Sequence, residues 1–166
     1  MGIKCKTTIN KLPEISASLE TLNGRKIKVG VLKGEHQWLA GIHEYGCNIP
    51  VTPKMRAFLH SQGLHLKEST KVIHIPERSF LRTGHDKNID KVMKTLERAI
   101  GLVSAGKMST DDLLETCGRQ LATAIKTYAR DVSSPANHPF TIDQKGSSNP
   151  LVDTGNMIEG ITWEVE

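Results

Sequence analysis

The chain has 166 residues, a length that corresponds to one domain with a hydrophobic core of useful size. Aromatic residues make up only 4% of the sequence, so the core must be built mainly from aliphatic side chains. The net charge of +4 does not by itself indicate nucleic-acid binding, and no apolar run reaches the roughly 20 residues that a membrane span needs.

Hydrophobic spacing predicts two short helices and a strand in the first part of the chain. Apolar residues recur at helical spacing in 11–22, and alternation in 26–32 is typical of a half-buried strand. A second short helix is expected over 37–45, and Gly46 ends it.

Residues 48–75 have the least regular pattern of the chain. Two strands are expected around 54–59 and 64–67, and a clearer alternation predicts a strand over 71–75 that Pro76 terminates. We therefore expect this segment to form a protruding, partly exposed β-hairpin arm.

Two long amphipathic helices are predicted next, over 86–103 and 110–132. Ser109 is a suitable N-cap for the second helix, because its hydroxyl can accept a hydrogen bond from a free backbone N–H group. Both helices have one apolar stripe, which predicts that they pack against the core.

The end of the chain is expected to contain a loop and a final strand. Residues 133–159 are rich in turn-forming residues, whereas alternation in 160–165 predicts a strand that pairs with 26–32 or with the hairpin. The whole order predicts an α+β fold for residues 1–166 as a single domain. In this fold a mostly antiparallel sheet has two long helices packed on one face and an extended β-hairpin arm.

The sequence offers no convincing catalytic or cofactor motif. Residues 101–108 have the glycine and lysine spacing of a phosphate-binding loop, but Met108 replaces the required hydroxyl and the segment ends a predicted helix. Cys117 lies on an apolar helix face, which indicates a buried, unreactive thiol. We therefore expect no enzyme activity and no cofactor.

Cysteine and histidine usage is also uninformative about metal binding. The three cysteines form no CxxC pair and are typical of free thiols in a reducing cytoplasm, and the polar start predicts no secretory signal. The histidines lack HExxH spacing, so polar surface and loop positions are favoured over a metal-dependent hydrolase site. The histidines are His36, His43, His60, His65, His74, His85 and His138.

Four basic residues of the predicted helix 86–103 recur at i, i+4, i+7 and i+11 and so share one helix face. A solvated face explains this pattern. The alternative is a face that lines a channel for DNA, because phosphates attract such a stripe without sequence being read. This basic stripe consists of Lys87, Lys91, Lys94 and Arg98.

Three short motifs occur in a fixed order around the two long helices. His43-Glu44-Tyr45-Gly46 ends the second short helix, 76–82 reads P-E-R-S-F-L-R, and Leu151-Val152-Asp153-Thr154-Gly155 precedes the last strand. This ordered set, from about residue 26 to the end, resembles the virion-morphogenesis and tail-completion (neck) proteins of tailed phages, of the Mu-type and lambda-like kinds.

The resemblance implies a structural virion component of the phage head–tail neck. It would be a tail-completion or tail-terminator-like ring protein, expected to be hexameric, that joins the tail tube to the head-closure connector. Assembly would take place in the host cytoplasm, with other neck and tail proteins as partners, non-specific contact with DNA in the channel, and no membrane association. The alternative is a small basic DNA-binding module that acts in phage morphogenesis.

The motif residues have physical roles that fit such a protein. Gly46 and Gly155 can adopt positive φ at sharp turns, and Phe80 can enter the core. Arg78 and Arg82 are either ordinary surface arginines or partners of a neighbouring subunit's carboxylates. The motif residues proposed for interfaces are His43, Glu44, Tyr45, Gly46, Pro76, Arg78, Phe80, Arg82, Asp153, Thr154 and Gly155; the last three are expected to form a side-chain-stabilised turn.

Overall fold

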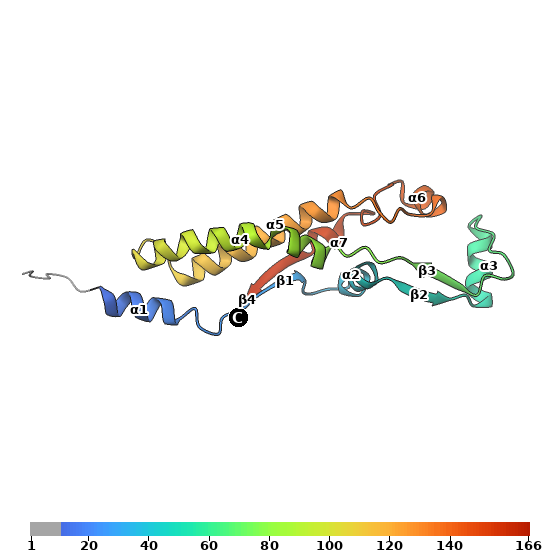
Figure 1. Cartoon of the computed structure of the whole chain (residues 1–166). Coiled ribbons are helices and arrows are strands. Elements are labelled where there is room, and N and C mark those ends of the chain that lie inside the picture. The colour runs from blue at the N-terminus through green and yellow to red at the C-terminus, as the bar shows by residue number, and fades with distance from the viewer. Residues whose placement is uncertain (1–10) are drawn as a thin grey trace, which may run out of the picture.

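The computed structural model describes residues 11–166 and shows an elongated α+β chain (Figure 1). Cys5 and the polar start of the chain lie outside the described residues. The helices are α1 (Leu12–Glu20), α2 (His36–Tyr45), α3 (Pro53–Ser61), α4 (Leu81–Ser104), α5 (Thr110–Asp131), α6 (Pro139–Lys145) and α7 (Asn156–Glu159), and the strands are β1 (Ile27–Val31), β2 (Cys47–Pro50), β3 (Val72–Ile75) and β4 (Ile161–Val165).

The two long helices α4 and α5 lie side by side and form the centre of the core (Figure 1). As predicted, Ser109 caps α5: its hydroxyl accepts a hydrogen bond of 3.0 Å from the Asp112 N–H group. Leu113, Cys117 and Ile125 on α5 are almost completely buried, so the apolar stripe of this helix faces inward. The two long helices therefore pack against each other in the core.

Strands β1 and β4 form an antiparallel sheet that packs on α5. Of the two partners expected for the last strand, segment 26–32 and the hairpin, the structure has the first. Val29 lies opposite Trp163. The Trp163 ring rests on Gly118 of α5, where an added Cβ atom would lie 2.4 Å from the ring. The close approach of sheet and helix therefore depends on a residue without a side chain.

Strands β2 and β3 form a second, separate antiparallel sheet, so the expectation of one sheet is wrong for the described residues. The strands run away from the long helices and carry α3 at their far end (Figure 1). We call residues 47–75 the arm. No residue of the arm is buried.

Two strands predicted inside the arm are absent. Residues 54–59 are part of α3, and 64–67 form no regular element. The reason lies at the start of the helix, where the Thr52 hydroxyl accepts a hydrogen bond of 3.1 Å from the Met55 N–H group and Pro53 occupies the first turn. The capping residues therefore favour a helix over 54–59 more strongly than the weak alternation of apolar residues favours a strand.

The segment predicted as a loop contains two short helices, α6 and α7. His138 caps α6 through its ring nitrogen, Pro139 begins it, and Gly146 ends it in the left-handed conformation. Gly155, with φ of 86°, is the N-cap residue of α7. The predicted positive φ of Gly155 is therefore confirmed.

Candidate functional site

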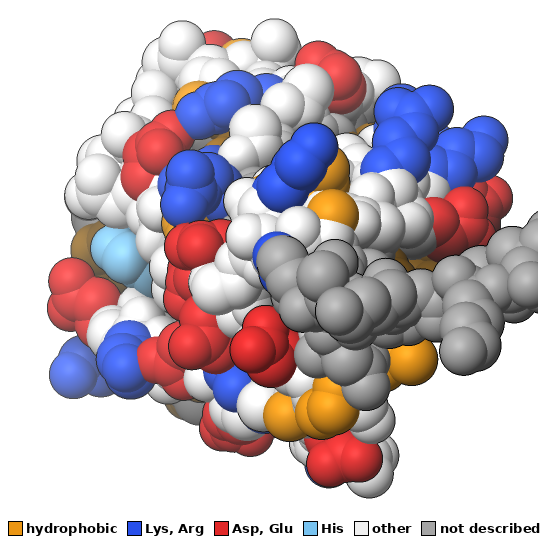
Figure 2. All heavy atoms as spheres, turned by 90° about the vertical axis from the view of Figure 1, so that its left-hand side faces the viewer, with side chains coloured by type: hydrophobic (Ala, Val, Ile, Leu, Met, Phe, Trp, Pro, Cys, Tyr) orange, Lys and Arg blue, Asp and Glu red, His pale blue; other side chains and the backbone are white. Residues whose placement is uncertain are grey.

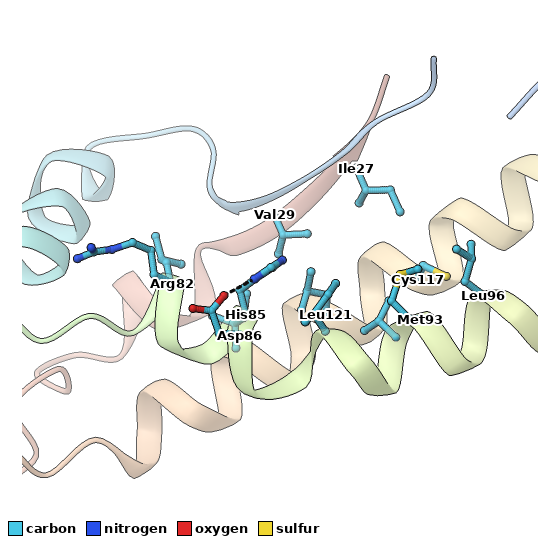
Figure 3. A pocket seen from close by; sticks show the side chains of 13 residues that line it. Ile27, Val29, Arg82, His85, Asp86, Met93, Leu96, Cys117 and Leu121 are labelled. Carbon is cyan, nitrogen blue, oxygen red and sulfur yellow. Dashed lines mark hydrogen bonds and ion pairs between the residues drawn. The ribbon is translucent and has the colours of Figure 1, made fainter. Parts of the chain in front are cut away.

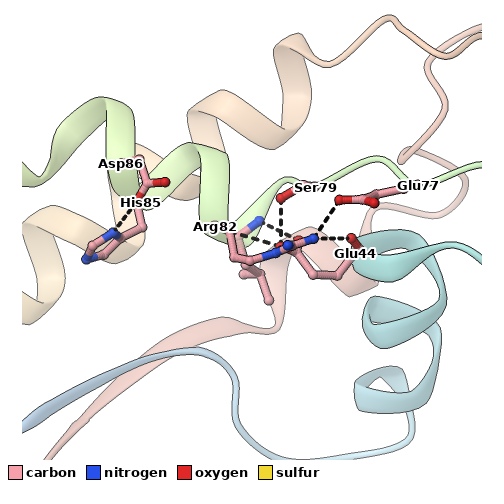
Figure 4. A network of polar contacts seen from close by, with 7 residues as sticks. Glu44, Glu77, Ser79, Arg82, His85 and Asp86 are labelled. Atoms are coloured by element: carbon pink, nitrogen blue, oxygen red, sulfur yellow. Dashed lines mark hydrogen bonds and ion pairs between the residues drawn. The ribbon is translucent and has the colours of Figure 1, made fainter.

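The first two sequence motifs meet where α2 ends and α4 begins (Figure 4). The buried Glu44 carboxylate accepts hydrogen bonds from the N–H groups of Leu81 (2.8 Å) and Arg82 (3.1 Å) and from the Ser79 hydroxyl (2.8 Å). The first N–H groups of a helix have no partner within it, and a negative charge is favourable there. Glu44 therefore caps α4 from another element, and α4 begins at Leu81, earlier than the predicted residue 86.

Arg82 fixes the Glu44 side chain in this position. Its Nε atom donates to Glu44 Oε1 (2.8 Å), and its Nη2 atom donates to the Glu44 carbonyl oxygen (3.0 Å) and to Glu77 Oε1 (2.6 Å). The guanidinium also lies over the Tyr45 ring, 4.8 Å from the ring centre. Burial alone would raise the pKa of Glu44, but the hydrogen bonds from Leu81, Arg82 and Ser79 outweigh burial and lower it.

Gly46 lets the two motifs approach each other closely. Its φ is 69°, as predicted, and an added Cβ atom would lie 2.8 Å from both the Glu77 nitrogen and the Ile75 oxygen. Beside it, the Arg78 N–H group donates to the His43 carbonyl oxygen at 2.7 Å. The backbone of the first motif is thus attached directly to that of the second, which begins at Pro76 after β3.

Arg78 lies inside its own chain, whereas the sequence left it as either a surface arginine or a partner of a neighbouring subunit's carboxylate. The residue is only 5% exposed. Its Nε atom donates to the Pro135 carbonyl oxygen (2.7 Å), and its Nη2 atom donates to Ala136 O (3.3 Å) and Asn137 Oδ1 (3.1 Å). Burial lowers the pKa of Arg78, yet a guanidinium stays charged in proteins. Phe80, two residues on, is fully buried, as predicted.

A pocket with several polar lining residues adjoins this junction, and all three motifs border it. It consists of two cavities of about 300 and 450 Å³ that share His43, Asn137 and Thr141 as lining residues. His43 Nδ1 and Asn137 Nδ2 are the two buried side-chain atoms among the described residues that have no hydrogen-bond partner. Burial, together with the charges of Arg78 and Lys145, lowers the pKa of His43 to about 4.

The third motif contributes to the wall of the smaller cavity, which Asp153, Thr154 and Gly155 line. The expected turn is present, with Thr154 Oγ1 3.5 Å from the Asn156 nitrogen. The Asp153 charge raises the pKa of Lys145, although burial of the ammonium group has the larger, opposite effect. Asn137, Thr141 and Lys145 were not predicted as site residues, because their segment was interpreted as a loop.

The basic stripe of Lys87, Lys91, Lys94 and Arg98 lies exposed on α4. Lys87 Nζ lies 4.6 Å from the centre of the Tyr128 ring, and the other three residues form no ion pair with residues 11–166. At the end of the molecule shown in Figure 2, lysine and arginine side chains are interspersed with aspartate and glutamate. Contact of the stripe with DNA stays a prediction.

An apolar groove lies between β1 and the helix pair α4–α5 (Figure 3). Its cavity measures about 640 Å³, and Met93, which was predicted to be in the core, is 45% exposed on its wall. His85 and Asp86 also line it, and the His85 Nδ1 and Asp86 Oδ1 atoms are 2.9 Å apart. Its apolar residues are Ile27, Val29, Leu81, Ile89, Val92, Met93, Leu96, Cys117, Leu121 and Ile125.

The other histidines and cysteines of residues 11–166 form no recognisable centre. His60 and His65, which the spacing predicts to be apart on a helix, touch because α3 ends at Ser61; their Nδ1 atoms are 2.7 Å apart. Residues 11–166 contain no group of three or more His, Cys, Asp or Glu side chains that could hold a metal ion. Burial raises the pKa of the Cys117 thiol, which accordingly is a core group.

Comparisons with known proteins do not assign a family to the chain. No family model, no curated protein and no solved structure matches it. The resemblance to phage neck proteins therefore depends on the order and content of the three motifs. Within the described part of the chain, no helix has both the length and the hydropathy needed to cross a membrane.

Proposed function

We propose that the chain is a structural, non-catalytic component of the phage head–tail neck. In this proposal it is a tail-completion or tail-terminator-like protein that forms a ring between the tail tube and the head-closure connector. The order of the three motifs supports this proposal. Their role would be architectural, since Glu44, Arg82 and Gly46 join α2 to α4 and contain no arrangement for covalent chemistry.

The observation that carries the proposal is the amount of interaction surface that one copy leaves unused. The sheet β1–β4 has two strands, so both of its outer edges are unpaired within residues 11–166. The apolar groove opens beside β1. On α2, Trp38 and Tyr45 are 75% and 68% exposed. Apolar surfaces of this kind mark interaction sites on proteins.

These surfaces suit a ring because they differ from one another. Trp38 and Tyr45 are seven residues apart and project from one side of α2, whereas the groove is concave and lies between β1 and α4. Contact between two different patches repeats from copy to copy and stops when the ring closes. The arm, with Phe58 62% exposed on α3, would reach a neighbouring copy or another neck protein.

The proposal predicts a discrete oligomer, expected to be a hexamer, in light scattering and electron microscopy. Met93→Glu in the groove and Trp38→Glu on α2 should each give monomers, because a charge would be buried at the contact. Mixing the two variants should give dimers, since one intact groove can still bind one intact α2 face. Leu102→Glu, an exposed apolar position of α4 outside the groove, is the matched control and should still form rings.

The opposite results would remove the proposal. A wild-type chain that stays monomeric at every concentration, and that binds neither phage tails nor connectors, contradicts it. Oligomers of unchanged size in both the Met93→Glu and Trp38→Glu variants would show that the surfaces named here are not the contacts.

The basic stripe supports a second candidate, a DNA-binding module that acts in phage morphogenesis. Lys91, Lys94 and Arg98 are exposed and have no acidic partner in the described chain. Binding of bare duplex DNA should then weaken steeply as salt rises. A gel-shift assay at low salt without retardation would exclude this candidate, whereas ring formation without DNA would favour the first.

A further inference from the structure

We propose that the pocket between α2, α6 and the end of β3 binds a carboxylate group, provided by a small organic acid or by an acidic side chain of another protein. The inference goes beyond the proposed function and does not depend on ring formation. It rests on the hydrogen-bond donors that line the pocket and on its excess of positive charge.

Asn137 presents a donor that has no acceptor. Its Oδ1 atom accepts a hydrogen bond of 3.1 Å from Arg78 Nη2, which fixes the orientation of the amide. The Nδ2 atom is therefore the group left without a partner, and it is buried. An unpaired buried donor costs roughly 1–3 kcal/mol, so its retention indicates a ligand or an ordered molecule beside it.

Thr141 and His43 add polar groups on the same wall. The Thr141 hydroxyl forms no hydrogen bond with residues 11–166, although the side chain lines both cavities. His43 Nδ1 is buried and unpaired. A neutral imidazole places its proton on either nitrogen, so His43 can donate from Nδ1 once an acceptor is present. Asn137, Thr141 and His43 thus all line both cavities of the pocket.

Lys145 supplies a cation beside these groups. Its Nζ atom donates to Asn149 O at 3.1 Å and Pro150 O at 3.3 Å, which accounts for two of the three ammonium protons. Burial lowers the pKa of Lys145, which shows that the charge is poorly solvated. The third proton is available for an anion.

The pocket as a whole has one more full positive charge than negative. Arg78 and Lys145 are cations, and Asp153 is the one carboxylate among the residues that line either cavity. The remaining titratable lining groups are His36, His43, His74 and His138. Arg78 is buried and forms no ion pair with the described residues. One added carboxylate would balance this charge, whereas a doubly charged phosphate would exceed it.

Binding of an anion in the pocket can be measured through the pKa of His43. The positive charges of Arg78 and Lys145 contribute to the low pKa of His43, which is about 4. An anion placed between these cations and the imidazole would offset their effect and raise the pKa of His43. Binding of the anion is then linked to protonation of His43.

The test is an NMR titration of the full chain in chloride buffer, with sodium acetate as the probe. Acetate should shift the signals of the His43 ring, the Asn137 side-chain amide and Thr141 saturably, and should raise the pKa of His43. Lys145→Gln and Thr141→Val should each weaken acetate binding by about tenfold. Thr123→Val, which changes an exposed hydroxyl of α5, is the matched control and should bind like the wild type.

Two further titrations identify where the carboxylate comes from and whether the pocket prefers it to phosphate. A capped peptide with one glutamate that binds more tightly than acetate would identify an acidic side chain of a partner, whereas tighter binding of acetate would identify a free organic acid. Inorganic phosphate that binds more tightly than either would overturn the proposal. So would the absence of saturable shifts, or unchanged acetate binding in a folded Thr141→Val variant.

Discussion

The helical body and the arm are held together by different forces. We call α1, α4, α5, α7, β1 and β4 the body. In the body, side chains such as Leu113, Ile125 and Ile158 are removed from water almost completely. In the arm, residues 47–75, no residue is buried, and order comes from the β2–β3 pairing and from capping at α3.

This difference means that the body provides most of the stability of the fold, whereas the arm provides surface for contact with other chains. Complete burial of one large aliphatic or aromatic side chain stabilises a fold by roughly 1.5–3 kcal/mol, so the body has a strong source of stability. Two paired strands alone are marginal in water. The arm therefore depends on its junction with the body at Gly46 and on polar contacts at its tip. Its surface remains exposed for contact with other chains.

The largest expected effect is at the junction, where Glu44 caps α4. Glu44→Gln removes the negative charge and replaces one of the two acceptor oxygens with an NH₂ donor, so either the Leu81 or the Arg82 N–H group loses its acceptor. We expect the free energy of unfolding to fall by about 3 kcal/mol, measured by urea denaturation. The body should lose stability although the change lies on α2.

Glu77→Gln is the matched control, because Glu77 also pairs with Arg82 but is half exposed. It should cost less than about 1 kcal/mol. The folded pKa of Glu44 lies below its ordinary value of 4.5, so its contribution is present above pH 4.5 and is lost as pH falls through the folded pKa. Equal costs for the two variants would contradict the capping role.

The next effect is a pH dependence that His43 confers on the same junction. The unfolded chain binds the proton near pH 6.5, but the folded chain binds it only near 4. The free energy of unfolding should therefore fall as pH drops through this window, by about 2 kcal/mol between pH 7 and pH 5. His43→Gln should remove this part of the dependence in chloride buffer, whereas His74→Gln in the arm should retain it.

The same contrast between body and arm explains which elements the sequence predicted. The body elements have strong periodic patterns, because burial demands apolar residues at 3.6 or 2 residue spacing. Helix α5 and the pairing of β1 with β4 were accordingly predicted well. The arm buries nothing, so its sequence is free of this constraint, and α3 could be recognised only from the Thr52-Pro53 cap.

The sequence predicted only part of the candidate site at the junction of α2 and α4, because most of its contacts join residues that are far apart in the chain. The motifs identified Glu44, Arg78 and Arg82, but the sequence left the two arginines as either surface residues or partners of a neighbouring subunit. In the structure both arginines donate to groups of their own chain. Those contacts join residues far apart in sequence, and no local pattern encodes them. Asn137 and Lys145 were missed because polar residues in a short helix resemble those of a loop.

The smallest effect is expected at the tip of the arm, where hydrogen bonds from Arg56, and not buried apolar side chains, hold the loop after α3. Its Nη1 atom donates to the carbonyl oxygens of Leu66 (3.0 Å) and Lys67 (2.9 Å), and its Nη2 atom donates to Thr70 O (2.6 Å). Arg56→Met should lower the local opening free energy of residues 62–71 by about 1 kcal/mol, since none of these carbonyl groups belongs to a fully buried residue and water can replace the lost donor.

Hydrogen exchange by mass spectrometry separates this local effect from global unfolding. Amides of 62–71 should exchange several times faster in Arg56→Met, whereas α4 and α5 should keep their protection, because the arm contributes no buried side chain to the core. Lys54→Met, an exposed change on the same helix, should alter neither region. If Arg56→Met instead weakened protection across α4 and α5, the arm and the body would unfold as one cooperative unit, and the surface of the arm would be no more available to partners than the core.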